Sequence, residues 1–214
     1  MLTLDKINYS KNNQLIISNL GFSVGLNSCV AIKGKNGSGK TTLLRIIAGL
    51  NEIDSSQNSG EILWNNKNIS QIKDDFFADI QYLGHSNFLK SHLSVFDNLL
   101  FWAKMQNSEI LIPSAVRYFK LEDVIDKKVK QLSSGWKKRV ILAKLLCCPS
   151  TIWLLDEPTV NLDKEGKDLL FNLVSSRIKE NGIVIIATHD DLFSPISTTI
   201  NLEDFKEKND NSQN

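Results

Sequence analysis

Cysteine is scarce in this chain, and the few cysteines present form no metal-binding pattern. The 214 residues include three, Cys29, Cys147 and Cys148. Cys29 lies in an apolar run, and the adjacent pair closes a stretch with helical spacing. Cysteines in such positions are usually small core residues. We therefore expect three free, buried thiols and no cysteine-ligated metal.

A large charge of one sign and long apolar runs are also lacking. The formal net charge is +1, whereas a nucleic-acid-binding protein shows a clear basic excess. No run approaches the roughly 18 apolar residues that can span a bilayer, and residues 1–6 lack the basic and then apolar pattern of a signal peptide. We expect a globular chain that binds no nucleic acid and stays in the compartment where it is made.

One stretch fits the phosphate-binding pattern G-x-x-x-x-G-K-[ST] at every position. It follows the apolar run Cys29–Ile32, which predicts a buried strand, and precedes the helical pattern Leu43–Ala48. Its glycines let backbone N–H groups turn inward around a di- or triphosphate, Lys40 brings a positive charge to the outer phosphates, and the Thr41 hydroxyl can ligate Mg²⁺. The expected phosphate-contacting residues are Gly34, Lys35, Asn36, Gly37, Ser38, Gly39, Lys40, Thr41 and Thr42.

Asp156 and Glu157 end a continuous apolar run, which predicts a buried strand of a parallel sheet. Ligands bind such sheets at the carboxyl ends of the strands. We therefore expect Asp156 to hold the same Mg²⁺ as Thr41, and Glu157 to orient or deprotonate a water aimed at the terminal phosphate. A second apolar run, Ile183–Ala187, brings His189 to the same edge, where it could sense or polarise that phosphate. A structural ion-pair site and a structural histidine are the alternatives.

A second anion site is expected far along the chain. Ser133 or Ser134 is a good N-cap for the amphipathic helix that follows, and Gly135 is a small neighbour. The N-terminus of a helix binds anions through its free N–H groups. Two anion sites for one nucleotide need an explanation.

The first thirty residues predict antiparallel strands. The runs Leu2–Leu4, Leu15–Ile17 and Phe22–Val24 each predict a strand. An Asn-Asn turn predicts a hairpin within Gly60–Ile69 that joins the same sheet. Tyr9 is expected on a polar turn before the phosphate loop. Its ring could stack on an adenine, or it could be an ordinary half-buried residue at a strand end.

A block of helical spacing follows, from about His85 to Lys130, with a break at Pro113. Its aromatic residues Phe96, Phe101 and Trp102 would form a core or line a groove for a partner helix. A later helix is expected from about Lys164 to Lys179. The order of the segments predicts one α/β domain, with a phosphate loop, a mostly parallel sheet and two additions. The expected limits are 1–30 and 58–72 for an antiparallel β subdomain, 31–57 and 132–203 for the ATP-binding core, 85–131 for an inserted α-helical subdomain, and 204–214 for a polar, frayed tail.

These motifs, in this order and approximate spacing, resemble those of the ATP-binding cassette proteins, the nucleotide-binding subunits of ABC transporters. The resemblance covers residues 1–203 and rests on the phosphate loop, Leu132–Trp136, Leu154–Pro158, Asn161–Asp163 and Thr188–Asp190. It implies a P-loop NTPase core of the RecA type, integral membrane partners and a head-to-tail homodimer that holds two ATP molecules. Each ATP would lie between Lys40 of one copy and the Ser133–Gly135 segment of the other, which would account for two anion sites per chain.

The resemblance also implies a role for each site residue. Lys40, Glu157 and His189 would act on the phosphates and the attacking water, Thr41 and Asp156 would hold Mg²⁺, and Asp163 would communicate across the dimer. Two positions depart from the family pattern. His85 stands where the family has a glutamine, and it could still accept a hydrogen bond from a metal-bound water at the nucleotide. Ser134-Gly135-Trp136 stands where the family has Gly-Gly-Gln. Phosphate binding should survive these changes, but the hydrolysis rate and the dimer contacts are open.

Within the family, Tyr82–His85 and Ile152–Glu157 are similar to the heme exporter ATP-binding subunits of cytochrome c maturation. This implies peripheral attachment at the cytoplasmic face of the inner membrane, or at the matrix face in a mitochondrion, and ATP turnover that releases a heme-loaded chaperone. The ATPase subunit of another small exporter or of a lipoprotein-release complex is an alternative. A cassette ATPase acting on ribosomes or DNA usually has two cassettes or a long insertion, and a P-loop kinase would leave Leu132–Trp136 unexplained.

Overall fold

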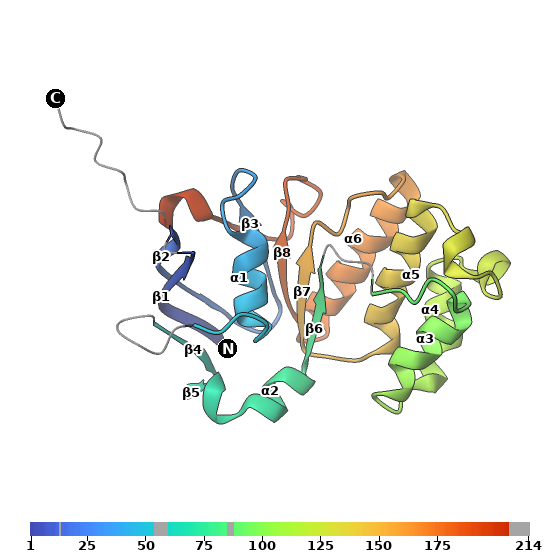
Figure 1. Ribbon diagram of the computed structural model, residues 1–214, viewed down its shortest axis with the longest axis horizontal. Coiled ribbons are helices and arrows are strands. Elements are labelled where there is room, and N and C mark those ends of the chain that lie inside the picture. The colour runs from blue at the N-terminus through green and yellow to red at the C-terminus, as the bar shows by residue number, and fades with distance from the viewer. Residues whose placement is uncertain (13, 54–59, 85–87, 206–214) are drawn as a thin grey trace.

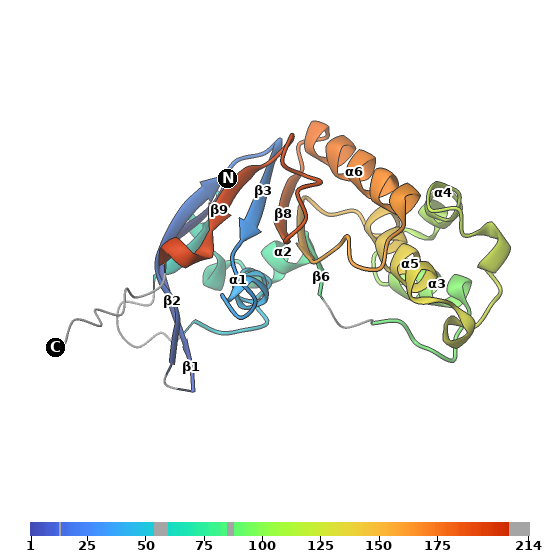
Figure 2. The same cartoon turned by 90° about the horizontal axis from the view of Figure 1, so that it is seen from above.

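Two β-sheets and a block of helices lie side by side in the structure (Figure 1). The computed structural model describes residues 1–12, 14–53, 60–84 and 88–205 of the protein. The antiparallel sheet lies at one end, the parallel sheet in the middle and the helical block at the other end, in both views (Figures 1 and 2). This is the α/β arrangement with two additions that the sequence predicts.

The N-terminal sheet has antiparallel strands in the order β2-β1-β4-β5. Asn65 and Asn66 have φ angles of 50° and 64°, as a two-residue hairpin turn requires, so the predicted hairpin is confirmed. The prediction of two separate strands within residues 14–24 is wrong, because a bulge near Asn19, whose φ is 49°, carries a single strand past the polar residues. The strands are β1 (Leu2–Lys11), β2 (Gln14–Val24), β4 (Glu61–Trp64) and β5 (Lys67–Asn68).

The central sheet is parallel throughout, with its strands in the order β6-β7-β8-β3-β9. β7 and β8 are buried along their whole length, as expected for strands covered on both faces. β6 and β9, which are short and lie at the two edges of the sheet, were not predicted from the sequence. The strands are β3 (Ser28–Lys33), β6 (Ile80–Leu83), β7 (Ile152–Asp156), β8 (Ile183–Ala187) and β9 (Thr198–Asn201).

Helices cover both faces of the parallel sheet. α1 (Lys40–Ile47) shares one apolar core with the antiparallel sheet and with one face of β3, β7 and β8, and it lies between the two sheets in Figure 2. α5 (Ser134–Cys147) and α6 (Lys164–Lys179) share a second core with the opposite face. The predicted range of α6 is confirmed, because Asp163 caps its first turn. A short helix, α2 (Lys73–Ala78), precedes β6.

The helical block packs α3 (Val95–Lys104) and α4 (Ile112–Tyr118) against α5. α3 begins at Val95 rather than near His85, because Ser94 and Asp97 form a capping box there. The predicted break at Pro113 lies in the first turn of α4, where proline costs no hydrogen bond. Trp102 is buried, whereas Phe96 and Phe101 are 42% and 44% exposed, so only Trp102 belongs to the core. Short 3₁₀ turns lie at Ile69–Gln71, Glu109–Leu111, Glu122–Val124, Val129–Gln131 and Leu202–Phe205.

The three cysteines are free and buried, as predicted. Burial raises the pKa of the Cys29 and Cys147 thiols to about 12 and also raises that of Cys148. Asp204 and Phe205, which were assigned to the frayed tail, lie in the last 3₁₀ turn, and the rest of that segment lies outside the described residues. Among the described residues, no helix combines the length and the apolar character needed to cross a membrane.

Candidate functional site

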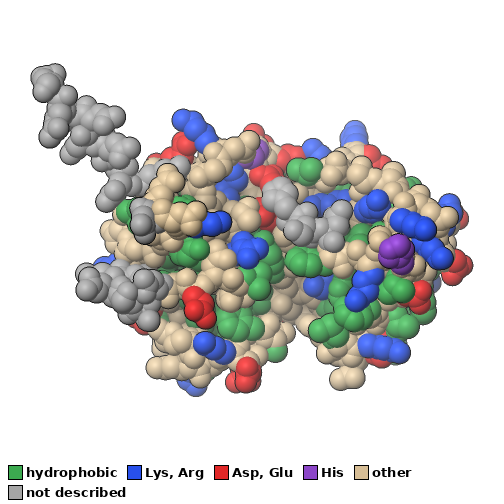
Figure 3. Space-filling view, viewed as in Figure 1, with side chains coloured by type: hydrophobic (Ala, Val, Ile, Leu, Met, Phe, Trp, Pro, Cys, Tyr) green, Lys and Arg blue, Asp and Glu red, His purple; other side chains and the backbone are tan. Residues whose placement is uncertain are grey.

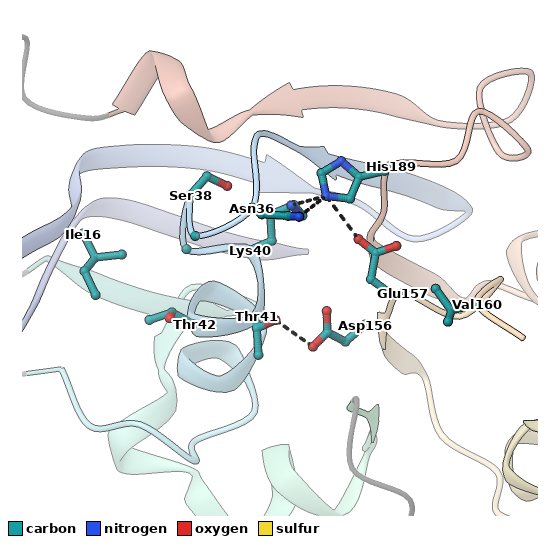
Figure 4. A pocket seen from close by; sticks show the side chains of 12 residues that line it. Ile16, Asn36, Ser38, Lys40, Thr41, Thr42, Asp156, Glu157, Val160 and His189 are labelled. Atoms are coloured by element: carbon teal, nitrogen blue, oxygen red, sulfur yellow. Dashed lines mark hydrogen bonds and ion pairs between the residues drawn. The ribbon is translucent and has the colours of Figure 1, made fainter. Parts of the chain in front are cut away.

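A pocket of about 530 Å³ opens at the carboxyl ends of β3, β7 and β8 (Figure 4). Each strand ends in a segment that supplies side chains: the phosphate loop and α1 follow β3, Asp156 and Glu157 end β7, and His189 follows β8. The sheet therefore brings together residues that are far apart in the sequence. The pocket is lined by Ile16, Asn36, Gly37, Ser38, Gly39, Lys40, Thr41, Thr42, Asp156, Glu157, Val160 and His189.

Two glycines of the loop cannot be replaced without movement. Gly39 has a φ of 103°, and a Cβ there would lie 2.8 Å from Ile16 Cγ2. Gly34 has a φ of 147°, and a Cβ there would lie 2.6 Å from Ser38 Oγ. Among the described residues, no side chain caps the N-terminus of α1 at Gly39, so the first N–H groups of α1 can bind an anion. The Ser38 hydroxyl is buried without a hydrogen-bond partner in the described part of the chain, which also fits a phosphate oxygen.

Lys40 is 7% exposed and reaches along the loop from the start of α1. Its Nζ donates to the carbonyl oxygens of Gly34, at 2.8 Å, and Lys35, at 3.3 Å. His189 Nε2 lies 2.9 Å from the same Nζ. The Lys35 side chain is 85% exposed and lies near Glu203 rather than in the pocket, and Gly34 and Lys35 line a neighbouring hollow.

His189 lies between the phosphate loop and the end of β7 (Figure 4). Its Nε2 is 2.9 Å from Asn36 Oδ1 and 3.7 Å from Glu157 Oε1. Below it, the Thr41 hydroxyl donates to Asp156 Oδ2 at 2.8 Å. The structure thus gathers Lys40, Thr41, Asp156, Glu157 and His189 into one pocket, as the sequence analysis expects.

The backbone at Glu157 is unusual, with a φ of 44°. This left-handed conformation is uncommon for residues other than glycine and persists where the surroundings hold it. The Glu157 N–H donates to the Ala187 carbonyl oxygen at 2.8 Å, and its own carbonyl oxygen accepts from Lys138 Nζ at 3.1 Å. Burial lowers the pKa of the Lys138 ammonium to about 8, and the Asp156 and Glu157 carboxylates oppose that shift.

Sequence reasoning missed Lys138 and its neighbour Arg139. Arg139 donates to Asp163 Oδ1 and Oδ2, at 2.9 and 3.0 Å, and to Glu165 Oε2, at 2.7 Å. The hydrogen bond from Arg139 is the main cause that lowers the pKa of the Asp163 carboxyl. A signal was available, because Lys137, Lys138 and Arg139 are consecutive on a helix. Their side chains point in directions about 100° apart, so the three charges spread over more than half of the circumference of the helix, although the part of α5 that follows them is largely apolar and buried.

Ser133 and Gly135 do not line this pocket. Ser133 is exposed and caps α5 by accepting from the Trp136 N–H at 3.4 Å, which confirms the predicted N-cap. The structure therefore keeps the two predicted anion sites of one chain apart.

Tyr9 lies inside β1, opposite Ile17, so its prediction on a polar turn is wrong. β1 continues past Tyr9 because β2 pairs with it as far as Lys11. The Tyr9 hydroxyl accepts from Asn51 Nδ2 at 3.3 Å, and Ile16, which the sequence analysis did not select, lines the pocket instead. His85 lies outside the described residues.

Comparisons with known proteins agree with this architecture. A profile described as "ABC transporter" matches residues 17–160. Several relatives carry the name "Cytochrome c biogenesis ATP-binding export protein CcmA", among them two from intracellular bacteria. The protein of Wolbachia pipientis wMel is 38% identical over 206 residues, which are 96% of this chain and 98% of that protein. The protein of Rickettsia conorii is 41% identical over 189 residues, 88% and 93% of the two chains.

Solved structures show the same fold. A putative ABC transporter ATP-binding protein from Pyrococcus furiosus has a TM-score of 0.80 at 26% identity, over 96% of this chain and 98% of its own. For cbiO1 from Clostridium perfringens, part of the ABC transporter complex cbiONQ, the TM-score is 0.76 at 28% identity, over 94% and 83%. The predicted fold class is thereby confirmed. This chain belongs to the ABC transporter family as an ATP-binding, ATP-hydrolysing subunit homologous to CcmA.

Proposed function

We propose that this subunit hydrolyses ATP with the residues gathered in the pocket of Figure 4, and that it does so for a membrane complex that exports heme in cytochrome c biogenesis. The observation that carries the first part is the meeting of Lys40, Glu157 and His189 at the ends of three neighbouring strands. The second part is supported by relatives named for cytochrome c biogenesis that match this chain over nearly its whole length.

Each pocket residue has a role that follows from its position. The loop N–H groups and Lys40 bind the phosphate oxygens. Glu157 orients the attacking water and accepts its proton while the bond from the terminal phosphorus to the bridging oxygen breaks. His189 lies beside both Lys40 and Glu157. It contacts the terminal phosphate and fixes the position of Lys40 relative to Glu157.

Thr41 and Asp156 fit a magnesium site. Their oxygens lie 2.8 Å apart, and a hydroxyl beside a carboxylate offers the hard oxygen ligands that Mg²⁺ prefers. Bound there, Mg²⁺ would neutralise charge on the phosphate oxygens. Thr41 and Asp156 come from the start of α1 and the end of β7, so they would also fix the distance between the phosphate loop and Glu157.

The active form is a head-to-tail homodimer. The α5 N-terminus at Ser133 and Gly135 is an anion site that does not reach the pocket of its own chain, and a second copy would place it against that copy's phosphate loop. Two nucleotides would then be shared by two chains.

The Ser133→Glu substitution tests this arrangement. A carboxylate at the α5 N-terminus would repel the phosphates of a nucleotide held by the other copy. In the hydrolysis-deficient Glu157→Gln background, we expect ATP to produce a dimer in light scattering, and Ser133→Glu to abolish it while the Kd for ATP of the monomer stays within about twofold. A Ser133→Glu chain that still dimerises would contradict the arrangement.

A second hollow fits a membrane partner. It has a volume of about 530 Å³ and lies between the core and the helical block, and Figure 3 shows hydrophobic side chains on both sides of the hollow between the two lobes. Lys90 Nζ lies 4.4 Å from the ring centre of Phe101, and Lys144 Nζ lies 5.5 Å from that of Trp102. Burial lowers the pKa of Lys144, so an acidic group would be a favourable neighbour. We infer that a helix of an integral membrane subunit, apolar with one acidic residue, binds here and holds this chain at the cytoplasmic face of the inner membrane.

Truncation of Phe101 tests both the partner and the pathway. An aromatic anchor of an interface is worth about 2 kcal/mol or more, so Phe101→Ala should lower co-purification with membranes at least about tenfold. Formation of c-type cytochromes, measured by heme staining, should fall in parallel, while ATPase activity of the isolated subunit persists. Phe96→Ala is the matched control, because Phe96 is equally exposed on the same helix but lies outside the hollow. Loss of membrane binding with unchanged c-type cytochromes would point to another exporter.

A further inference from the structure

Lys138 occupies a position that packing alone does not explain. It lies on α5, and its ammonium reaches the end of β7, where it donates to the Glu157 carbonyl oxygen at 3.1 Å. Burying a charged group is unfavourable unless partners compensate for the lost water. An apolar side chain would fill the same space without that penalty. Lys138 is part-buried, and the Glu157 carbonyl oxygen and the Asp156 and Glu157 carboxylates offset that cost.

The hydrogen bond from Lys138 holds the backbone of Glu157 in an unusual conformation. Glu157 has a φ of 44°, so the chain turns sharply after β7, and the Glu157 side chain reaches within 3.7 Å of His189 in the pocket. Its N–H is held by the Ala187 carbonyl oxygen at 2.8 Å, and its carbonyl oxygen by Lys138 and by the Val160 N–H, the latter at 3.3 Å. Both ends of the residue are thereby held, one from β8 and the other from α5.

We propose that Lys138 is a positioning residue for ATP hydrolysis, which holds the Glu157 peptide so that the carboxylate points into the pocket. This inference rests on the proposed role of Glu157 as the group that activates water. Lys138 does not line the pocket and acts through Glu157. Since Ser133 caps the helix that carries Lys138, Lys138 also links the α5 N-terminus to Glu157.

The test is Lys138→Met, which keeps the length of the side chain and removes the ammonium. We expect the kcat for ATP hydrolysis to fall by about 10- to 100-fold, the usual effect of a small misplacement of a catalytic group. The KM for ATP should stay within about twofold, because the phosphate loop is untouched. Lys137→Met is the matched control on the same helix and should keep the wild-type kcat. Lys138→Gln, whose amide is too short to reach the carbonyl, is the second variant if Lys138→Met does not fold.

The double variant separates positioning from a merely structural role. If Lys138 acts through Glu157, adding Lys138→Met to Glu157→Gln should cause no further loss of kcat. A further loss of tenfold or more, or a wild-type kcat in Lys138→Met, would overturn the inference. The failure of the inference about Lys138 can be distinguished from the failure of the proposed role of Glu157. Wild-type turnover in Glu157→Gln alone refutes the role of Glu157, whereas a slow Glu157→Gln beside a fast Lys138→Met refutes only that of Lys138.

Discussion

Replacing Glu157 with glutamine is expected to lower the kcat for ATP hydrolysis by about 10²- to 10⁴-fold, the usual contribution of a positioned general base. Glutamine has nearly the same shape but cannot accept the proton of the attacking water. Because the backbone of Glu157 is held from β8 and from α5, the amide should occupy the place of the carboxylate. ATP should therefore still bind with a Kd within about twofold of the wild-type value.

Phosphate release under saturating ATP measures this effect, and binding of ATP is measured separately. Glu180→Gln makes the same chemical change at the far end of α6 and should leave both quantities unchanged. Wild-type turnover in Glu157→Gln would remove Glu157 from the mechanism. If His189→Ala lowered kcat more than Glu157→Gln, His189 would be the better candidate for the proton acceptor, since the two side chains are only 3.7 Å apart.

Substitution of Lys40 should have the second large effect, this time on binding. A charge-assisted hydrogen bond is worth about 1.5–3 kcal/mol, so Lys40→Met should raise the Kd for ATP by about 10- to 150-fold. We expect Lys40→Arg to be nearly as damaging. The Lys40 Nζ is enclosed by two carbonyl oxygens and His189 within 3.3 Å, and a planar guanidinium does not fit where a compact ammonium does.

Equilibrium binding of a fluorescent ATP analogue measures the change in Kd. Lys67→Met removes an exposed ammonium from β5, far along the chain from the loop, and should bind ATP normally. Near wild-type affinity in Lys40→Arg would mean that charge alone, rather than the shape of the enclosure, selects the residue at this position.

The elements at the pocket were predictable because local pattern and chemistry coincide there. β3, β7 and β8 are continuous apolar runs, and each leads directly into the residues that line the pocket. α6 was bounded correctly because Asp163 is an N-cap and its apolar residues follow the helical period. The residue types of the phosphate loop have few other uses in a strand–loop–helix setting.

The parts that were missed depend on contacts between distant segments. β6 and β9 have four residues each, which is too few for an alternation of apolar and polar residues to be recognised. They form strands because they pair with the neighbouring strands β7 and β3. β2 continues as one strand through a polar stretch, because a bulge there lets it stay paired with β1. Lys138 contacts Glu157 across nineteen positions of sequence, and no local pattern in α5 identifies that partner.

The burial of all three thiols has a practical consequence for experiments on this protein. Thiolates are the species that react with maleimides and similar reagents, and at neutral pH thiols with a pKa near 12 are almost entirely protonated. Because Cys29, Cys147 and Cys148 are also shielded by packing, a cysteine engineered on the surface should be labelled selectively in the native background. Spectroscopic probes of subunit motion can then be attached without first removing the natural cysteines.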